Sequence, residues 1–249
     1  MRIGVNIPNF DTDPGRLRDQ AQAVEGLGFD LLMMSDHVVV TPDVAAQYPA
    51  PFYEPFTTLA YVAGMTERIQ LGTTVLIVPY RHPLLTARMA ANLNDLSGGR
   101  LVLGVGVGWA RQEFEALGIP FERRGRITDD HLGEIRKAWQ DEGYRAGHIP
   151  IWVGGNSDAA IARARRIGDA WHPLHFTMPW LEERLDGGPF VPRIKLRLNG
   201  KREQAGEGTI EEVLDDLNEL GRLGAETVVL DPVDFSDIET IAEHLGRKS

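Results

Sequence analysis

The stretch PIWVGGNSDAAIARARRIGDAW, residues 150–171, holds a complete strand–turn–helix unit and the start of the next strand. Its opening PIWVG is a short apolar run, which predicts a strand. The helix predicted after Gly155 has an apolar face that includes Ile161 and Ala164, and another apolar run follows at residues 169–172. Continuously apolar strands joined by helices predict a parallel sheet that is buried on both faces.

The same alternation runs along the whole chain. Strands are predicted at residues 2–7, 30–34, 69–78, 100–107, 150–154, 169–172, 192–198 and 226–230. Eight such strands favour a closed (β/α)8 barrel, a TIM barrel, over an open doubly wound sheet. The first strand ends in NIPNF and lacks the glycine fingerprint that an open dinucleotide-binding sheet would carry there. We therefore expect an α/β fold with a single barrel domain over residues 1–249.

Caps and glycines mark the ends of the predicted helices. Asp13 predicts an N-cap with a proline next to it in the first turn, and Pro83 opens a helix that should end at the SGG of residues 97–99. Residues 209–212, TIEE, and 236–239, SDIE, each fit a capping box. These signals place helices in most of the connections between predicted strands.

Composition and charge limit the partners that this chain can have. Hydrophobic residues make up 43% and charged residues 25% of the sequence, which is typical of globular proteins rather than of disordered chains. The formal net charge of −10 argues against nucleic acid and anionic membranes as partners. The sequence has no cysteine, no signal-peptide pattern at its start and no apolar run of membrane-spanning length. We expect a cytoplasmic protein that acts on a small molecule.

The histidines of the chain do not form a metal-binding pattern. His37, His82, His172 and His175 have neither a Glu-x-x-His helix nor a His-x-His pair on the first strand beside them, and acidic residues near the strand ends are few. No metal site is predicted.

Residues at the carboxyl ends of the strands form the active site of a (β/α)8 barrel. Asp36 and His37 follow the second predicted strand and offer a carboxylate and an imidazole, a group that transfers protons near neutral pH. The structural alternative is that Asp36 caps a turn and that His37 only packs there.

Glycines at the ends of the fifth and fourth predicted strands suggest different roles. Gly154 and Gly155 lead into a helix whose first N–H groups are unpaired, which favours an anion site such as a phosphate cradle. In the alternative, Asn156 or Ser157 caps these N–H groups internally. The run GVGVG at residues 104–108 misses the dinucleotide-binding spacing, so there the glycines more simply permit a bulge or the close approach of another group.

Four segments, in the same order, carry a family resemblance. MSDH, LGTTVLIVPYRHPLLTAR, LSGGRLVLGVGVGW and PIWVGGNSDAAIARARRIGDAW together resemble the bacterial luciferase-like superfamily, and most closely its members that use the deazaflavin coenzyme F420. The resemblance extends from Arg2 to Pro232, which is nearly the whole chain.

The resemblance implies a barrel that holds a flavin or deazaflavin at its carboxyl-terminal mouth, where a hydride passes between the ring and a substrate. The family pattern places the cofactor against Asp36, Thr74, Val75, Val107, Gly108, Gly154, Gly155 and Asn156. It also implies a non-proline cis peptide at Thr74–Val75, in a bulge of the third strand. His37 would be the catalytic residue, as proton donor or acceptor or as the group that stabilises developing charge.

The sequence departs from its relatives at the substrate side. Trp109 stands where the sugar-phosphate dehydrogenase branch has a glutamate, so we expect a less polar substrate whose pocket includes Trp109 and Tyr80. The insertion regions at residues 139–150 and 180–192 are short, which implies a shallower, more open pocket.

The leading hypothesis is therefore a coenzyme F420-dependent oxidoreductase. The alternatives are an FMN-dependent luciferase-like monooxygenase and a cofactor-binding barrel without turnover. Relatives commonly form homodimers, and the alanines at 87, 90 and 91 would serve close helix packing either between two copies or within one barrel. Arg81, Arg165 and Arg166 would either meet an acidic cofactor tail or lie on solvated helix faces.

Overall fold

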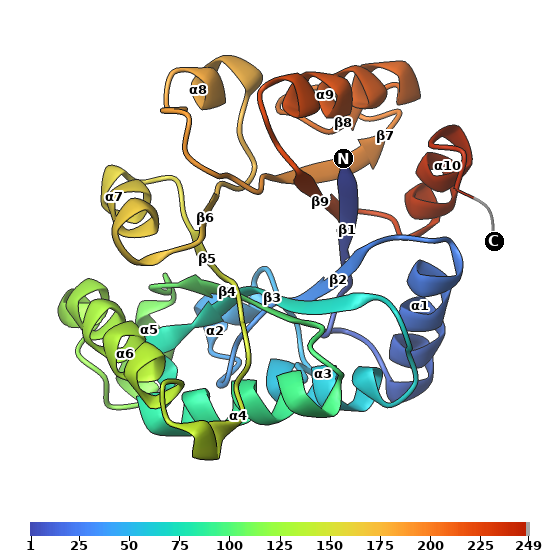
Figure 1. The fold of residues 1–249 in the computed structure, drawn as a ribbon. Helices are drawn as coiled ribbons and strands as arrows, with labels where there is room; N and C mark the ends of the chain where they lie inside the picture. Colours follow the sequence, from blue (N-terminus) through green and yellow to red (C-terminus); the bar gives the residue numbers. More distant parts are fainter. Residues whose placement is uncertain (248–249) are drawn as a thin grey trace. The chain divides into compact units, whose positions relative to one another are not determined.

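A computed structural model describes residues 1–247, and strands alternate with helices along this range (Figure 1). The strands are β1 (Arg2–Asn6), β2 (Leu31–Met34), β3 (Gln70–Ile77), β4 (Leu101–Gly106), β5 (Ile151–Gly154), β6 (Ala170–His172), β7 (Arg193–Leu198), β8 (Glu207–Gly208) and β9 (Thr227–Pro232). The helices are α1 (Pro14–Gly26), α2 (Pro42–Ala45), α3 (Pro55–Ala63), α4 (Pro83–Leu96), α5 (Arg111–Ala116), α6 (Arg124–Ala138), α7 (Asp158–Ile167), α8 (Met178–Glu182), α9 (Ile210–Arg222) and α10 (Ser236–His244). Three short 3-10 turns, η1 (Val78–Tyr80), η2 (Phe121–Arg123) and η3 (Glu142–Tyr144), complete the described elements.

The chain divides into two compact units. The first unit contains residues 1–7, 20–33 and the described chain from 152 onward, and the second unit contains residues 8–19 and 34–151. Each unit has its own set of contacts. The single domain predicted for residues 1–249 stays a prediction.

All strand pairs in the first unit are parallel. β1 pairs with β2 and with β9, β7 pairs with β9 and with the short β8, and β5 pairs with β6. One isolated parallel bridge joins Trp171 of β6 to Phe190, which precedes β7. A second joins Leu174, which follows β6, to Arg193 of β7. Because parallel strands have their carboxyl ends at one edge, this unit gathers the residues that follow β1, β5, β6 and β9 at that edge.

The second unit contains the parallel pair of β3 and β4. Their register shifts between Thr73 and Leu76, so β3 has one extra residue, a bulge, opposite β4. The peptide bond between Thr74 and Val75 is cis, which confirms the conformation that the family resemblance implied there.

The predicted strands are confirmed and one strand was missed. Each of the eight predicted runs contains a strand, whereas the two-residue strand β8 has no apolar run to indicate it. These strands, with the helices between them, confirm the predicted α/β fold class.

Helix caps confirm all but one of the predicted boundaries. Asp13 Oδ1 accepts hydrogen bonds from the N–H groups of residues 15 and 16, and the capping box of Thr209 and Glu212 is present. The box predicted at Ser236 is wrong, because Asp234 Oδ1 accepts from both the N–H and the hydroxyl of Ser236 and this serine is already the first helical residue.

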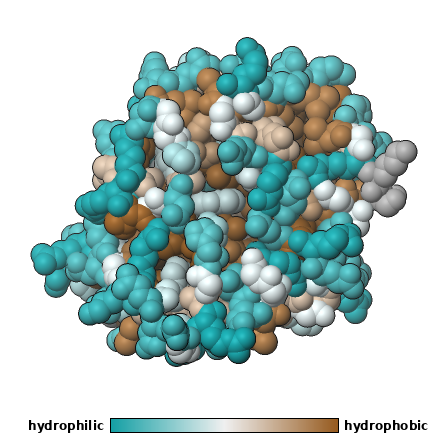
Figure 2. Space-filling model, viewed as in Figure 1, coloured by the Kyte–Doolittle hydropathy of each residue, from teal (hydrophilic) through white to brown (hydrophobic). Residues whose placement is uncertain are grey.

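Hydrophilic residues cover most of the face drawn in Figure 2, with apolar residues visible between them. The alanines at 87, 90 and 91 on α4 are fully buried within the chain, so the intramolecular alternative for this alanine face is correct. Within residues 1–247, no helix has the length and apolar character to cross a membrane.

Candidate active site

His37, the predicted catalytic residue, follows β2 and lies in the second unit with only 5% of its surface exposed. Its Nδ1 atom is 2.7 Å from Oε2 of Glu113 on α5. The Glu113 side chain is completely buried. A carboxylate in this position was not predicted from the sequence.

Glu113 accepts three further hydrogen bonds. The N–H groups of Val38 and Val39 donate to Oε1 at 2.6 and 2.9 Å, and the Tyr80 hydroxyl donates to Oε2 at 2.8 Å. Burial by itself raises the pKa of the Glu113 carboxyl, but the hydrogen bonds from His37, Val39 and Val38 outweigh burial and lower this pKa below its ordinary value. Burial and the neighbouring Glu113 charge raise the pKa of Tyr80, which keeps its hydroxyl protonated as a donor. Glu113 is therefore ionised near neutral pH.

An ionised Glu113 determines which ring nitrogen of His37 carries a proton. A carboxylate only accepts hydrogen bonds, so Nδ1 of His37 is the protonated nitrogen. The Nε2 atom is then free to accept a proton, and to return it from the imidazolium form that Glu113 stabilises. His37 has the arrangement expected of a general acid–base residue.

Aromatic rings surround His37. Its ring centroid lies 5.0 Å from that of Tyr48, 5.3 Å from that of Phe52 and 5.7 Å from that of Trp109. We call Tyr48, Phe52 and Trp109 the aromatic box. Trp109, predicted to line the substrate pocket, is 43% exposed and contacts the histidine edge to face. Tyr80, the other predicted pocket residue, instead points its hydroxyl at Glu113 and packs its ring on Phe114.

Asp36 makes structural contacts with its whole carboxylate. Arg81 forms a two-pronged ion pair with it at 2.7 Å on each oxygen, and the N–H of Ile77 donates to Oδ2 at 2.8 Å. Arg81 also donates to Glu54 at 2.8 Å. Burial raises the pKa of the Asp36 carboxyl, while the Arg81 guanidinium opposes that shift. These contacts lie within the second unit and hold Asp36 against the end of β3. A cofactor contact of Asp36 stays a prediction, and Arg81 is engaged within the chain.

The bulge of β3 requires a glycine on β4. A Cβ atom on Gly106 would lie 2.5 Å from Cγ2 of Val75, and one on Gly108, whose φ is +80°, would lie 2.8 Å from both Ile77 and Phe114. Gly106 and Gly108 of the GVGVG run thus serve close approach, as expected. The cofactor contacts predicted for Thr74, Val75, Val107 and Gly108 stay predictions.

The predicted phosphate cradle lies in the first unit, between β5 and α7. Gly155 has a φ of +124°, and a Cβ there would meet Ala160 at 2.9 Å, so only glycine fits. Ser157 Oγ caps the helix by accepting from the N–H of Ala160 at 3.2 Å. The N–H groups of Asp158 and Ala159 make no hydrogen bond to the described part of the chain. Internal capping is therefore partial, and two donors at the helix N-terminus are left for an anion.

The Asn156 side chain is engaged within the chain. Its Nδ2 donates to the carbonyl of Leu174 at 2.7 Å, and its Oδ1 accepts from the N–H of Leu174 at 3.0 Å. The amide thus ties the loop after β6 to the cradle. Its backbone N–H remains available to a phosphate, and that contact stays a prediction.

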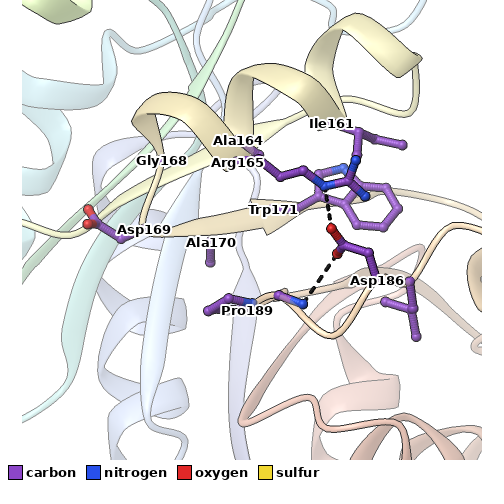
Figure 3. Close-up of a pocket in the computed structure, with 11 residues that line it drawn as sticks. Ile161, Ala164, Arg165, Gly168, Asp169, Ala170, Trp171, Asp186 and Pro189 are labelled. Atoms are coloured by element: carbon purple, nitrogen blue, oxygen red, sulfur yellow. Dashed lines mark hydrogen bonds and ion pairs between the residues drawn. The ribbon is translucent and has the colours of Figure 1, made fainter.

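Figure 3 shows a cavity of about 200 Å³ in the first unit, between α7, the start of β6 and residues 185–189. Arg165 Nε lies 2.6 Å from Asp186 Oδ2 across this cavity, so Arg165 is paired within the chain. The cavity adjoins the amino end of β6, whereas the predicted site residues follow the carboxyl ends of strands. It is therefore not the catalytic site.

Glu113 had a signal in the sequence that was not used. Ala110, Glu113, Phe114 and Leu117 occupy positions i, i+3, i+4 and i+7 of one helical stripe, and a carboxylate within an otherwise apolar stripe is rarely left without a partner. Its partners are residues 37–39 and Tyr80, which are distant from Glu113 in the sequence. In residues 1–247, no cluster of three or more His, Cys, Asp or Glu side chains is arranged to hold a metal ion.

Comparisons with solved structures show the same fold at low sequence identity. An F420-dependent secondary alcohol dehydrogenase, solved with an F420–acetone adduct, superposes with a TM-score of 0.78 and 15% identity over 97% of each chain. The monooxygenase RslO1 from Streptomyces bottropensis superposes with a TM-score of 0.77 and 19% identity over 98% of each chain. Both confirm the predicted luciferase-like, TIM-barrel-like fold.

Sequence comparisons give relatives that match in part. The uncharacterized protein Rv0940c of Mycobacterium tuberculosis is 30% identical over 181 residues, 61% of this chain and 62% of that protein. A phthiodiolone/phenolphthiodiolone dimycocerosates ketoreductase of the same species is 27% identical over 197 residues, 65% of this chain and 51% of the ketoreductase. The chain thus spans less than two thirds of the length of these relatives. The family model named "Luciferase-like monooxygenase" matches residues 1–186, and the chain therefore belongs to the luciferase-like monooxygenase family.

Proposed function

We propose that this chain is a coenzyme F420-dependent oxidoreductase that interconverts a small uncharged alcohol and the corresponding carbonyl compound. The observation that carries this proposal is the buried Glu113–His37 pair inside the aromatic box. An oriented acid–base histidine in an apolar environment suits a reaction in which a proton and a hydride leave the same substrate.

The chain's own residues handle the proton. In alcohol oxidation, Nε2 of His37 takes the hydroxyl proton, and Glu113 stabilises the imidazolium that results. In carbonyl reduction, the imidazolium returns this proton to the carbonyl oxygen. The cofactor, when bound, supplies the acceptor or donor of the hydride. Tyr48, Phe52 and Trp109 keep water away from this exchange and favour a neutral substrate, since a charged one would lose its hydration without gaining a partner.

The residues around Gly155 fit the phosphate of a flavin or deazaflavin. A side chain would fill the space beside Gly155, and two N–H donors at the start of α7 lack an acceptor in the described chain. Phosphate is held well by such a helix N-terminus. Both F420 and FMN carry a phosphate, so this feature supports either cofactor.

Three observations favour F420 over FMN. The chain resembles the F420 branch most closely in its MSDH segment, one structural neighbour is an F420-dependent secondary alcohol dehydrogenase, and one sequence relative is named a ketoreductase. A deazaflavin also lacks the ring nitrogen that favours oxygen chemistry. The alternative, an FMN-dependent monooxygenase, has support from neighbours such as RslO1 and the FMN-bound 3,6-diketocamphane monooxygenase.

A fluorescence-quenching titration with F420 and FMN, run in parallel, tests the cofactor. We expect tight F420 binding by the wild type and strong loss of it in Gly154→Asp, which places a negative charge in the cradle. Gly133→Asp adds the same charge on an open, exposed face of α6 and should bind like the wild type. Binding of FMN alone would move the assignment to the monooxygenases, and binding of neither would refute the cofactor proposal.

We also propose that the protein is a homodimer. Tyr61 on α3 and Leu84 and Leu85 on α4 are each about half exposed, and because α3 packs against α4, a partner on this face would cover apolar side chains of both helices. Light scattering at micromolar concentration should give twice the chain mass, and a monomer would contradict the assignment.

A further inference from the structure

The first unit contains a second histidine–carboxylate pair. His175, in the loop after β6, places Nε2 2.8 Å from Oδ2 of Asp231 near the end of β9. Both residues follow or lie near the carboxyl ends of parallel strands. Neither has a role in the acid–base chemistry assigned to His37.

Asp231 is fixed by two more donors. Asn6 Nδ2 donates to Oδ1 at 2.8 Å, and Arg193 Nη2 donates to Oδ2 at 2.7 Å. Burial alone raises the pKa of the Asp231 carboxyl, but the Arg193 charge and the hydrogen bonds from His175 and Asn6 lower it well below its usual range. Asp231 is therefore an acceptor throughout the neutral range, and Nε2 of His175 carries the proton that lies between them.

The backbone holds His175 in an uncommon conformation. Its φ is +46°, in the left-handed region, which non-glycine residues seldom adopt. Its N–H donates to the carbonyl of Arg193 at 3.0 Å, and the preceding Leu174 is held on both sides by the Asn156 amide. A residue held in this way at the carboxyl ends of strands is typical of a binding site rather than of a passive loop.

Two hydrogen-bond acceptors of this cluster lack a partner. With Nε2 on Asp231, the Nδ1 atom of neutral His175 is an acceptor, and the described chain offers it no donor, while 31% of the side chain is exposed. Asn6 donates a hydrogen bond through Nδ2, so its Oδ1 is the second acceptor. Only 6% of the surface of Asn6 is exposed, and its Oδ1 has no hydrogen-bond partner in residues 1–247. A buried acceptor without a partner carries a free-energy cost that a ligand donor removes.

We propose that Nδ1 of His175 and Oδ1 of Asn6 bind hydroxyl groups of a ligand. Both atoms are acceptors, so a hydroxyl donor is complementary to them, whereas an anion, which only accepts hydrogen bonds, is not. Two hydroxyl sources match this chemistry: a polyhydroxylated cofactor side chain and an alcohol substrate. The choice between these sources rests on the function proposed above, whereas the hydroxyl site itself does not.

Nitrogen-15 NMR of the histidine side chains tests the site directly in the 249-residue chain. In the ligand-free wild type, the neutral form of His175 should carry its proton on Nε2 and leave Nδ1 unprotonated. Its signals are assigned by their loss in His175→Gln, with His244→Gln as the control because His244 is exposed on α10. A proton on Nδ1 of neutral His175 would overturn the proposal.

Added probes then separate the possible ligands. Ribitol, a neutral polyol, should shift Nδ1 of His175 and leave Nε2 protonated; a shift with inorganic phosphate but not with ribitol would overturn the proposal. A shift with F420 alone assigns the site to the cofactor, and a shift that needs an added secondary alcohol assigns it to the substrate. If ribitol shifts Nδ1 but F420 does not bind, the cofactor proposal fails and the hydroxyl site stands. In His175→Gln, the affinity for the assigned ligand should fall about three- to tenfold, as expected for one lost hydrogen bond.

Discussion

Glu113 is the residue whose environment most affects the chemistry of this chain. Four donors converge on its buried carboxylate, from His37, Val38, Val39 and Tyr80. Removing the charge while keeping the shape leaves these donors facing an amide that is itself partly a donor. The same substitution should therefore affect both stability and the proton exchange at His37.

Glu113→Gln tests this dual role. We expect unfolding to become easier by about 3 kcal/mol, because buried donors lose a charged acceptor. The turnover number should fall by about a hundredfold, the scale of general acid–base catalysis. Glu122→Gln, on an exposed ion pair, is the control; a turnover number unchanged in Glu113→Gln would show that Glu113 acts on folding alone.

His172, at the end of β6, makes stability depend on pH. Burial lowers its pKa to about 4 from the ordinary 6.5. Above pH 6.5 both folded and unfolded states are neutral, and the stability is complete. Between pH 6.5 and pH 4 the unfolded state binds the proton and the folded state does not, so stability falls with pH by about 3 kcal/mol in all.

Urea unfolding of the wild type and of His172→Gln between pH 7 and pH 4 measures this loss. The glutamine keeps a donor for the carbonyl of Val191, which His172 Nδ1 contacts at 2.5 Å, but it cannot ionise. The variant should therefore lose less stability than the wild type over this range. His244→Gln should follow the wild type, and parallel curves for all three proteins would contradict the assignment.

At the scale of elements, the bulge of β3 and the glycines of β4 form one matched pair. Val75 points at Gly106, where a methyl group would stand 2.5 Å from Cγ2 of Val75. The extra residue of β3 thus requires a strand without a side chain beside it. This relation is local to the second unit.

Gly106→Ala should lower the free energy of unfolding by about 1–3 kcal/mol through overpacking. Gly133→Ala is the matched control, since no atom lies within 4 Å of its added Cβ and alanine favours the helix by about 0.5–1 kcal/mol. Denaturant unfolding of both variants is the measurement. Equal stability of Gly106→Ala and the wild type would show that Val75 moves aside without cost.

Elements with a strong local signal were predictable from the sequence. The eight strands have continuous apolar runs, and Thr209 and Glu212 carry their capping box within four residues. β8 has only two residues and no pattern. Two side chains near the start of α10 could cap this helix, Ser236 and Asp234. It is Asp234, two residues earlier, that accepts the hydrogen bonds there.

The candidate site was predictable only where its residues follow strands. His37 and Gly155 were found by their position after β2 and β5. The contacts of Glu113 and of the Asn156 amide were not predicted, because they depend on partners distant in the chain, His37 and Leu174. A carboxylate within an apolar helical stripe indicates that the side chain is buried, but it does not indicate which residue the carboxylate contacts.

At the scale of the whole molecule, cofactor binding should stabilise the fold. A ligand that binds only the folded state at a hundred times its Kd adds about 2.7 kcal/mol, which for a chain of this size raises Tm by about 5–10 °C. Thermal unfolding with F420 and with FMN, at matched excess, measures both cofactors. A rise with FMN and none with F420 would contradict the deazaflavin assignment.

The most direct test of the account is the rate of F420 reduction by uncharged secondary alcohols in the wild type and in His37→Ala, each saturated with cofactor. We predict turnover in the wild type and a fall of about a hundredfold or more in the variant, with F420 affinity changed by less than about threefold, because His37 moves a proton rather than holding the cofactor. Equal rates in both proteins, or tight F420 binding without turnover across the alcohols and their carbonyl partners, would contradict the assignment of His37 as the acid–base residue of an oxidoreductase.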